Sequence, residues 1–359
     1  MEVFEGVRCR AEAVEAFLGA LLRASGASPE SAAAAARAMT DASARGVDTH
    51  GIRLAPHYLR GLGGGRIKPC PEVRVERLSA AVVHVDADDG LGHLASYRAI
   101  ETGLEGAREA GLCAVTVGNS THHGATGCYT LAAARQGCAA LGRTNADAIV
   151  APHGGVKPFL GTNPVSFAVP VPGGRPMVLD MATSSIPLNR VLLRRATGAP
   201  LPPEVALDAE GAMTVDPFKA AALMPLGGVG FGYKGAGLAV MVDILCSAFT
   251  GMLHGARLPS FSADDVHRPA RLGHFFIVFA PDAFQPGDGF QARMAEFLDD
   301  LRAQPARPGE RVMAPGDPEW AAWDDRAAHG LPIDAATWED LGGFARRCGC
   351  ALPEVLGRA

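Results

Sequence analysis

The chain has 359 residues, of which 48% are hydrophobic and 20% charged, and its formal net charge at pH 7 is −5. This composition is typical of an ordered globular protein, and the length exceeds what one hydrophobic core usually supports, so we expect two or three domains. The slightly acidic balance provides no basic stripe, so nucleic acid is excluded as an expected partner.

The N-terminal part is predicted to be helical, with helices over residues 11–24 and 29–45. A serine and a proline at positions 28 and 29 are typical of an N-cap and a first helical residue. Further on, AAVVHVDAD (80–88) and LCAVTVGN (112–119) are predicted to be strands that flank the helical run ASYRAIETGLEGAREAG. This order indicates a β-α-β unit.

The rest of the chain continues the alternation of helices and strands. We expect a helix over TGCYTLAAARQG, strands over VSFAVPV and PMVLDMA, a helix over 227–251, a strand over GHFFIVFAP, and helices over DGFQARMAEFLDDLRA and AATWEDLGGFARRCG. The pattern predicts an α/β protein with an added helical part, and we place domain boundaries near residues 75 and 255.

Targeting and redox signals favour a cytoplasmic protein. The N-terminus lacks a basic region followed by an apolar core, so no signal peptide is expected. The eight cysteines contain no C-x-x-C pair, which favours a reduced chain. The longest apolar segment, AGLAVMVDILCSAFTGML, carries Asp243, so we predict a buried helix and no membrane partner.

Histidines beside glycine turns are the first candidates for acid–base chemistry, because the histidine pKa lies near neutrality. GVDTHGIRLAPHY contains Thr49 and His50, and GNSTHHGATGCY contains His122 and His123 at the end of a predicted strand, where α/β sheets bind ligands. A hydrogen-bonded structural histidine is the alternative at each position. The spacings of these histidines match no zinc pattern, so no metal is expected. The sequence contains no G-x-S-x-G motif, so a serine hydrolase is not expected either.

The stretch GGVGFGYKGAGLAVMVDIL (227–245) matches the dinucleotide fingerprint G-x-G-x-x-G at Gly230, Gly232 and Gly235. Its flanks do not fit, because helix-like residues precede it and no carboxylate follows about 20 residues later. Lys234 is followed by glycine, which excludes a Walker loop. Two alternatives remain: a glycine turn that binds an anion, or one that only caps a helix.

Seven sequence blocks, in order along the chain, resemble the type-2 malate/L-lactate dehydrogenase family, which includes ureidoglycolate and sulfolactate dehydrogenases, diketogulonate reductases and ketimine reductases. The blocks are DTHGIRLAPHY, NSTHHGATGCY, APHGG, LGTNPVSFAVP, DMATS, PLGG…YKGAGLA and VMAPGDPEW. The resemblance implies an α/β fold whose non-Rossmann, mixed-sheet domain (76–255) binds NAD or NADP. It also implies a helical domain built from both chain ends (1–75 and 256–359), and a homodimer.

The resemblance also implies roles for individual residues. The catalytic set is His50 as proton donor and acceptor, Thr49 beside it, and His122 at the nicotinamide and substrate. The substrate-binding set is Arg53, Tyr58, Thr162, Asn163 and Arg190. The cofactor-binding set is His122, His123, Gly124, Ala125, Thr126, Asp180, Met181, Ala182, Thr183, Tyr233, Lys234, Pro315, Gly316 and Asp317.

Three departures from the family pattern affect the substrate and cofactor sites. Family members often carry a carboxylate-binding arginine four residues after the histidine, but here Leu54 holds that position and Arg53 precedes it. The PLNRV stretch carries Arg190 where several members have an acid or a lysine, and this arginine is an alternative contact for an anionic substrate. The GGVGFGYKG loop is also longer than the commoner GGxKG.

The expected function is an NAD(P)-dependent oxidoreductase that transfers a hydride between nicotinamide and a small 2-hydroxy or 2-oxo acid similar to malate, lactate or ureidoglycolate. Reduction of a cyclic imino acid at its C=N bond is the alternative reaction. A non-catalytic nucleotide-binding relative is the third alternative, against which the retained His50 and His122 argue.

Overall fold

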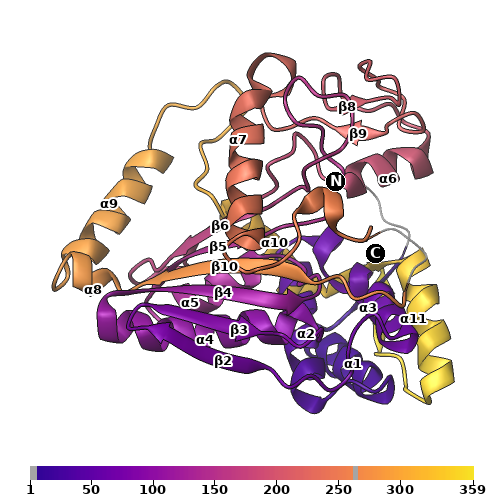
Figure 1. Ribbon diagram of the computed structural model, residues 1–359, viewed down its shortest axis with the longest axis horizontal. Coiled ribbons are helices and arrows are strands. Elements are labelled where there is room, and N and C mark those ends of the chain that lie inside the picture. The colour runs from indigo at the N-terminus through magenta and orange to yellow at the C-terminus, as the bar shows by residue number, and fades with distance from the viewer. Residues whose placement is uncertain (1–5, 262–265) are drawn as a thin grey trace.

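The computed structural model describes residues 6–261 and 266–359, and a seven-stranded sheet lies at the centre of this part of the chain (Figure 1). The strand order is β2-β3-β4-β10-β5-β6-β7. β3 and β4 are parallel, whereas the other neighbouring pairs are antiparallel, so the mixed sheet is confirmed. The strands are β2 (Arg74–Ser79), β3 (Val82–Asp86), β4 (Leu112–Ser120), β5 (Ala139–Thr144), β6 (Val165–Val169), β7 (Met177–Met181) and β10 (Leu272–Phe279).

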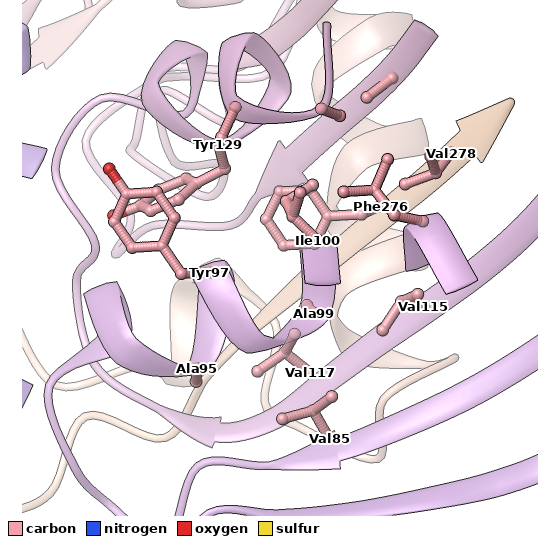
Figure 2. Close-up of a cluster of buried hydrophobic side chains, with 14 of the residues drawn as sticks. Val85, Ala95, Tyr97, Ala99, Ile100, Val115, Val117, Tyr129, Phe276 and Val278 are labelled. Carbon is pink, nitrogen blue, oxygen red and sulfur yellow. The ribbon is translucent and has the colours of Figure 1, made fainter. Parts of the chain in front are cut away.

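Helices cover both faces of this sheet, and β10 contacts both sets of helices. Successive side chains of a strand point to opposite faces of a sheet. Phe276 is fully buried against α4 (Gly92–Ala110) and α5 (Gly127–Ala134), and Figure 2 shows it near Ile100. Phe275 instead packs against Val242 and Cys246 of α7 (Gly228–Ser247). The predicted β-α-β unit is confirmed as β3-α4-β4.

The two ends of the chain build one helical unit beside the sheet (Figure 1). Its core joins Leu18 near the N-terminus to Leu331 and Leu341 near the C-terminus. Ser28 caps the second helix as expected, accepting a hydrogen bond from the Ser31 amide at 3.2 Å. The elements are β1 (Gly6–Cys9), α1 (Ala11–Ala24), α2 (Pro29–Ala44), α3 (Ala55–Gly64), α10 (Asp317–His329), β11 (Leu331–Asp334), α11 (Ala335–Cys348) and β12 (Val355–Arg358).

Several short elements complete the fold. β10 lies after the expected boundary near residue 255, yet it pairs with β4 and β5. The segment after residue 255 therefore contributes a strand to the central sheet as well as helices to the helical unit. The remaining elements are η1 (Asp48–His50), η2 (Ile52–Leu54), α6 (Leu188–Thr197), β8 (Ala206–Leu207), β9 (Ala222–Leu223), η3 (Gly255–Arg257), α8 (Pro281–Phe284) and α9 (Gly289–Arg302).

The glycine-rich stretch lies inside α7, so the predicted turn around Tyr233 and Lys234 is wrong. The helix begins early because Gly227 adopts a φ of 101° as its N-cap and Gly235 lies directly against the Leu226 backbone, where a Cβ would not fit. By length and composition alone α7 is apolar enough to span a membrane. One of its faces is buried as predicted, but the other exposes apolar side chains, including Phe231 and Ile244.

Candidate active site

A cavity of about 290 Å³ lies between the helical unit and the sheet. Its volume is at the lower end of the range for small-ligand sites. The walls come from η1, η2 and α3, the ends of β4 and β7, the start of α6, Pro259 and Phe261, and the segment that leads into β10. Of the residues predicted for the site, Thr49, His50, Tyr58, His122, Gly124, Ala125, Thr126, Thr162, Asp180, Met181 and Ala182 line this cavity.

His50 stands at the end of η1, a turn fixed tightly against α2. Gly51 lies so close to Ser43 that a Cβ would overlap the serine side chain, and the Ile52 amide donates to Ser43 Oγ at 3.0 Å. Thr49 Oγ1 lies 2.8 Å from His50 Nδ1. Burial lowers the pKa of His50 to about 4, so its imidazole is neutral at pH 7.

The contacts of His122 fix its tautomer. The Gly124 amide, which can only donate, approaches Nδ1 at 3.3 Å, and the Tyr58 hydroxyl lies 2.8 Å from the same nitrogen. Nδ1 is therefore an acceptor, and the ring proton resides on Nε2. Burial, followed by nearby histidines, lowers the His122 pKa well below its usual value. His122 is a neutral hydrogen-bond donor, and its ring centre lies 5.8 Å from that of His50.

The blocks GTNP and DMATS meet behind the cavity wall. Thr183 Oγ1 donates to the carbonyls of Thr162 at 3.0 Å and Asn163 at 3.1 Å. Asn163 is fully buried, accepting from the Ala146 amide and donating to the Ala239 carbonyl. Thr183 and Asn163 therefore support the cavity wall, whereas Thr162 lines it.

Asp180 lies at the N-terminus of α5, where its Oδ2 accepts from the Gly127 amide at 2.7 Å. Burial raises the Asp180 pKa to about 6, although this hydrogen bond opposes the rise. A Cβ on Gly127 would lie 2.8 Å from Asp180 Oδ2, so glycine allows the close approach. The carboxyl group thus joins the DMATS block to the helix that follows the second histidine block.

His123 points away from the cavity into a second layer of histidines. Its ring is fully buried, lies 2.8 Å from Ser96 Oγ and 3.0 Å from Thr126 Oγ1, and stacks on His274 at 4.1 Å between ring centres. His93, beside this layer, is fully buried, and neither ring nitrogen has a hydrogen-bond partner. Across residues 6–261 and 266–359, no three His, Cys, Asp or Glu side chains are grouped to hold a metal.

The structure keeps several predicted residues away from the cavity. Arg53 and Arg190 are exposed and do not line it. Tyr233 and Lys234 project from α7, and Lys234 Nζ lies 5.3 Å from the Phe231 ring centre. Three further residues, at the start of α10, also lie outside the lining: Pro315, Gly316 and Asp317.

Sequence reasoning missed other residues that line the cavity. Arg66 follows α3 in a GGGRIKP stretch that matches no motif, and Phe261 lies in a loop without periodicity. His57 lies within the DTHGIRLAPHY block, but its spacing from His50 matched no motif and no function was predicted for it. In the structure its ring stacks on Phe261, with the ring centres 3.9 Å apart. Burial, then Arg66 and Arg60, lowers its pKa to about 4.

Comparison with known proteins places these features in a family. The model of the malate/L-lactate dehydrogenase family matches residues 9–342. Malate dehydrogenase from Pyrococcus abyssi is 32% identical over 97% of both chains. The (2R)-3-sulfolactate dehydrogenase (NADP(+)) from Chromohalobacter salexigens is 34% identical over 91% of this chain and 94% of its own.

Solved structures agree with the sequence matches. The crystal structure of delta1-piperideine-2-carboxylate reductase from Pseudomonas syringae has a TM-score of 0.84 and 31% identity, covering 94% of this chain and 99% of its own. The chain belongs to the malate/L-lactate dehydrogenase family. It is an oxidoreductase that uses a nicotinamide cofactor.

Proposed function

We propose that the enzyme transfers a hydride between NAD or NADP and a small 2-hydroxy or 2-oxo acid, with His50 exchanging the proton and His122 polarising the substrate. The observation that carries this proposal is that two neutral imidazoles line one cavity, with their ring centres 5.8 Å apart. The cofactor supplies the hydride chemistry.

His122 would act through the Nε2–H group that its tautomer leaves for a ligand. Tyr58 and Gly124 hold Nδ1, so the ring is oriented before a substrate arrives. During oxidation, neutral His50 would take the proton of the substrate hydroxyl as the hydride leaves the substrate carbon. During reduction, His50 would first take up a proton from solvent, and the imidazolium would then give that proton to the substrate oxygen. Thr49 Oγ1 holds the other side of the His50 ring by its contact to Nδ1.

The residues around His122 fit a flat nicotinamide ring. Gly124 has a φ of 72°, and a side chain there would press on the His50 carbonyl at 3.1 Å, so glycine keeps this wall open. Ala125 and Ala182 add small apolar surfaces to the cavity. We propose that Gly124, Ala125, Thr126 and the wall 180–182 contact the nicotinamide end of the cofactor, with His123 and Thr183 supporting them.

Contacts to the outer part of the cofactor remain predictions for Tyr233, Lys234 and the start of α10. Lys234 is exposed on α7, and its ammonium group is available to an anion there.

Reduction of a cyclic imino acid is the second candidate. The likeness to the piperideine-carboxylate reductase over 94% of this chain favours it. The same two histidines serve it, because an imine nitrogen accepts a hydrogen bond and a proton as a carbonyl oxygen does.

The test is a turnover assay with NADH and with NADPH over matched 2-oxo acids and cyclic ketimines. We expect cofactor oxidation with at least one class and a loss of about 10²- to 10⁴-fold in kcat for His50→Ala. His153→Ala is the control, because His153 does not line the cavity. Cofactor binding without turnover of either class would favour the non-catalytic alternative.

We also propose that the enzyme is a cytoplasmic homodimer whose partner covers the exposed apolar face of α7. Phe231 is 62% exposed and Ile244 is 48% exposed on this helix, and apolar faces of this kind mark protein interfaces. Light scattering should report a dimer that Phe231→Asp weakens. Phe297→Asp, at a similarly exposed position on α9, should leave the dimer intact.

A further inference from the structure

The cavity contains few groups that carry charge at neutral pH. Among the described residues that line it, Arg66 is the single arginine or lysine, and the carboxylates are Asp147 and Asp180. The histidines that line the cavity are neutral at pH 7 because burial lowers each pKa, to about 4 for His50 and His57. Arg66 is thus the one permanent cation that the described lining offers to a substrate anion.

Arg66 is held firmly in place. It is 5% exposed, its backbone amide donates to the Val266 carbonyl at 2.7 Å, and Nη1 and Nη2 both donate to the Ser260 carbonyl at 3.2 Å. A guanidinium has five N–H groups in a fixed plane, and these contacts set the orientation of that plane. Because the group is largely removed from water, a carboxylate that reaches it gains a strong charge-assisted bond.

Apolar and aromatic side chains line the same cavity as Arg66. They include Leu54, Ile67, Leu272 and the stacked pair His57 and Phe261, and Phe261 directly follows Ser260, whose carbonyl holds the Arg66 guanidinium. A second carboxylate on the substrate would lie against this surface without a cation, and burying an unpaired charge is costly. The carboxylate of Asp147, which accepts from the Phe261 amide at 3.0 Å, would repel it further.

We propose that Arg66 anchors the substrate carboxylate and that the apolar wall receives an uncharged substrate body, which makes the preferred substrate a monocarboxylic 2-oxo or imino acid. This inference rests on the proposed function. Two features would set the specificity: Arg66, the one arginine or lysine among the described lining residues, and the aromatic wall of His57 and Phe261.

The first experiment compares monocarboxylic and dicarboxylic 2-oxo acids of matched length, 2-oxobutyrate with oxaloacetate and 2-oxovalerate with 2-oxoglutarate. We expect kcat/KM at least 10-fold higher for the monocarboxylic member of each pair. Phenylpyruvate should depend on the aromatic wall, so Phe261→Ala should raise its KM more than the KM for pyruvate. A higher kcat/KM for the dicarboxylic members overturns the proposal.

The second experiment removes the cation. Arg66→Met should raise the KM for 2-oxovalerate about 10- to 150-fold, as expected for a lost charge-assisted hydrogen bond, with a smaller change in kcat. Arg66→Lys, which keeps the charge but loses the planar fork, should lie between Arg66→Met and wild type. Arg74→Met is the matched control, because Arg74 is exposed on β2 and does not line the cavity. Equal effects of Arg74→Met and Arg66→Met overturn the proposal.

A binding measurement separates this inference from the proposed reaction. Calorimetric titration of 2-oxovalerate into the folded proteins, verified by circular dichroism, should show binding that Arg66→Lys weakens and Arg74→Met preserves. If binding follows this pattern but no substrate is turned over, the proposed reaction fails and the anchor stands. If turnover occurs and binding does not depend on Arg66, the anchor fails and the proposed function stands.

Discussion

A clamp from the far end of the chain holds the turn that carries His50. Arg326 of α10 donates Nη1 and Nη2 to the two carboxylate oxygens of Asp48, at 2.5 and 2.8 Å, and also to the Ser43 carbonyl. The two side chains are 14% and 27% exposed. Because Asp48 is the first residue of η1 and His50 the last, we predict that this clamp sets the position of the imidazole.

The predicted perturbation is Arg326→Met. Exposed ion pairs contribute about 0–1 kcal/mol to stability, whereas breaking a buried pair costs about 3–5 kcal/mol. Because the Arg326–Asp48 pair is partly buried, its loss should lower the free energy of unfolding by about 2 kcal/mol. A displacement of about 1 Å at a catalytic group costs up to about 100-fold in rate, so kcat should fall at least 10-fold. The affinity for the cofactor should change little, because the clamp lies behind His50.

The assay combines urea unfolding, kcat and cofactor Kd. Arg175→Met is the matched control, because Arg175 forms an equally bidentate pair with Asp324 of α10, but those side chains are 45% and 64% exposed. The control should retain wild-type kcat. An Arg326→Met enzyme that loses stability but keeps its kcat would refute the reasoning, and so would an equal fall in kcat in both variants.

Three further predictions concern the site, the histidine layers and α7. His50→Gln should lower kcat by about 10²-fold or more while the cofactor Kd stays within about twofold, and an unchanged kcat removes His50 from the mechanism. The folded-state pKa is about 4 for His50 and about 3 for His93 and His274, below the unfolded value near 6.5, so the unfolded chain binds more protons and stability should fall as pH drops from about 6.5 to 4. Urea midpoints that stay constant from pH 7 to 4.5 contradict this. Lys234→Met should weaken NADPH or NADH binding about 10- to 150-fold if the lysine meets a cofactor phosphate, and equal fluorescence titrations with wild type would leave it a surface residue of α7.

The sequence by itself determined the features that depend on neighbouring residues. Hydrophobic periodicity over 80–119 gave the β-α-β unit, and the Ser28 cap and Pro29 gave the start of α2, because helices, strands and caps are set within a few residues. The order of the seven blocks gave the family, which the comparisons confirm. Residues within the blocks, such as His50 and His122, were therefore found before the fold was known.

Only the tertiary structure decided which distant segments meet. β10 enters the centre of the sheet between β4 and β5, and no local pattern specifies such a partner, since strand pairing is a long-range choice. Arg66 became a candidate because folding turns its side chain to the cavity, although its sequence neighbours carry no motif. Asp48 and Arg326 lie 278 positions apart, and they pair because the two chain ends share one core that buries their common apolar surface.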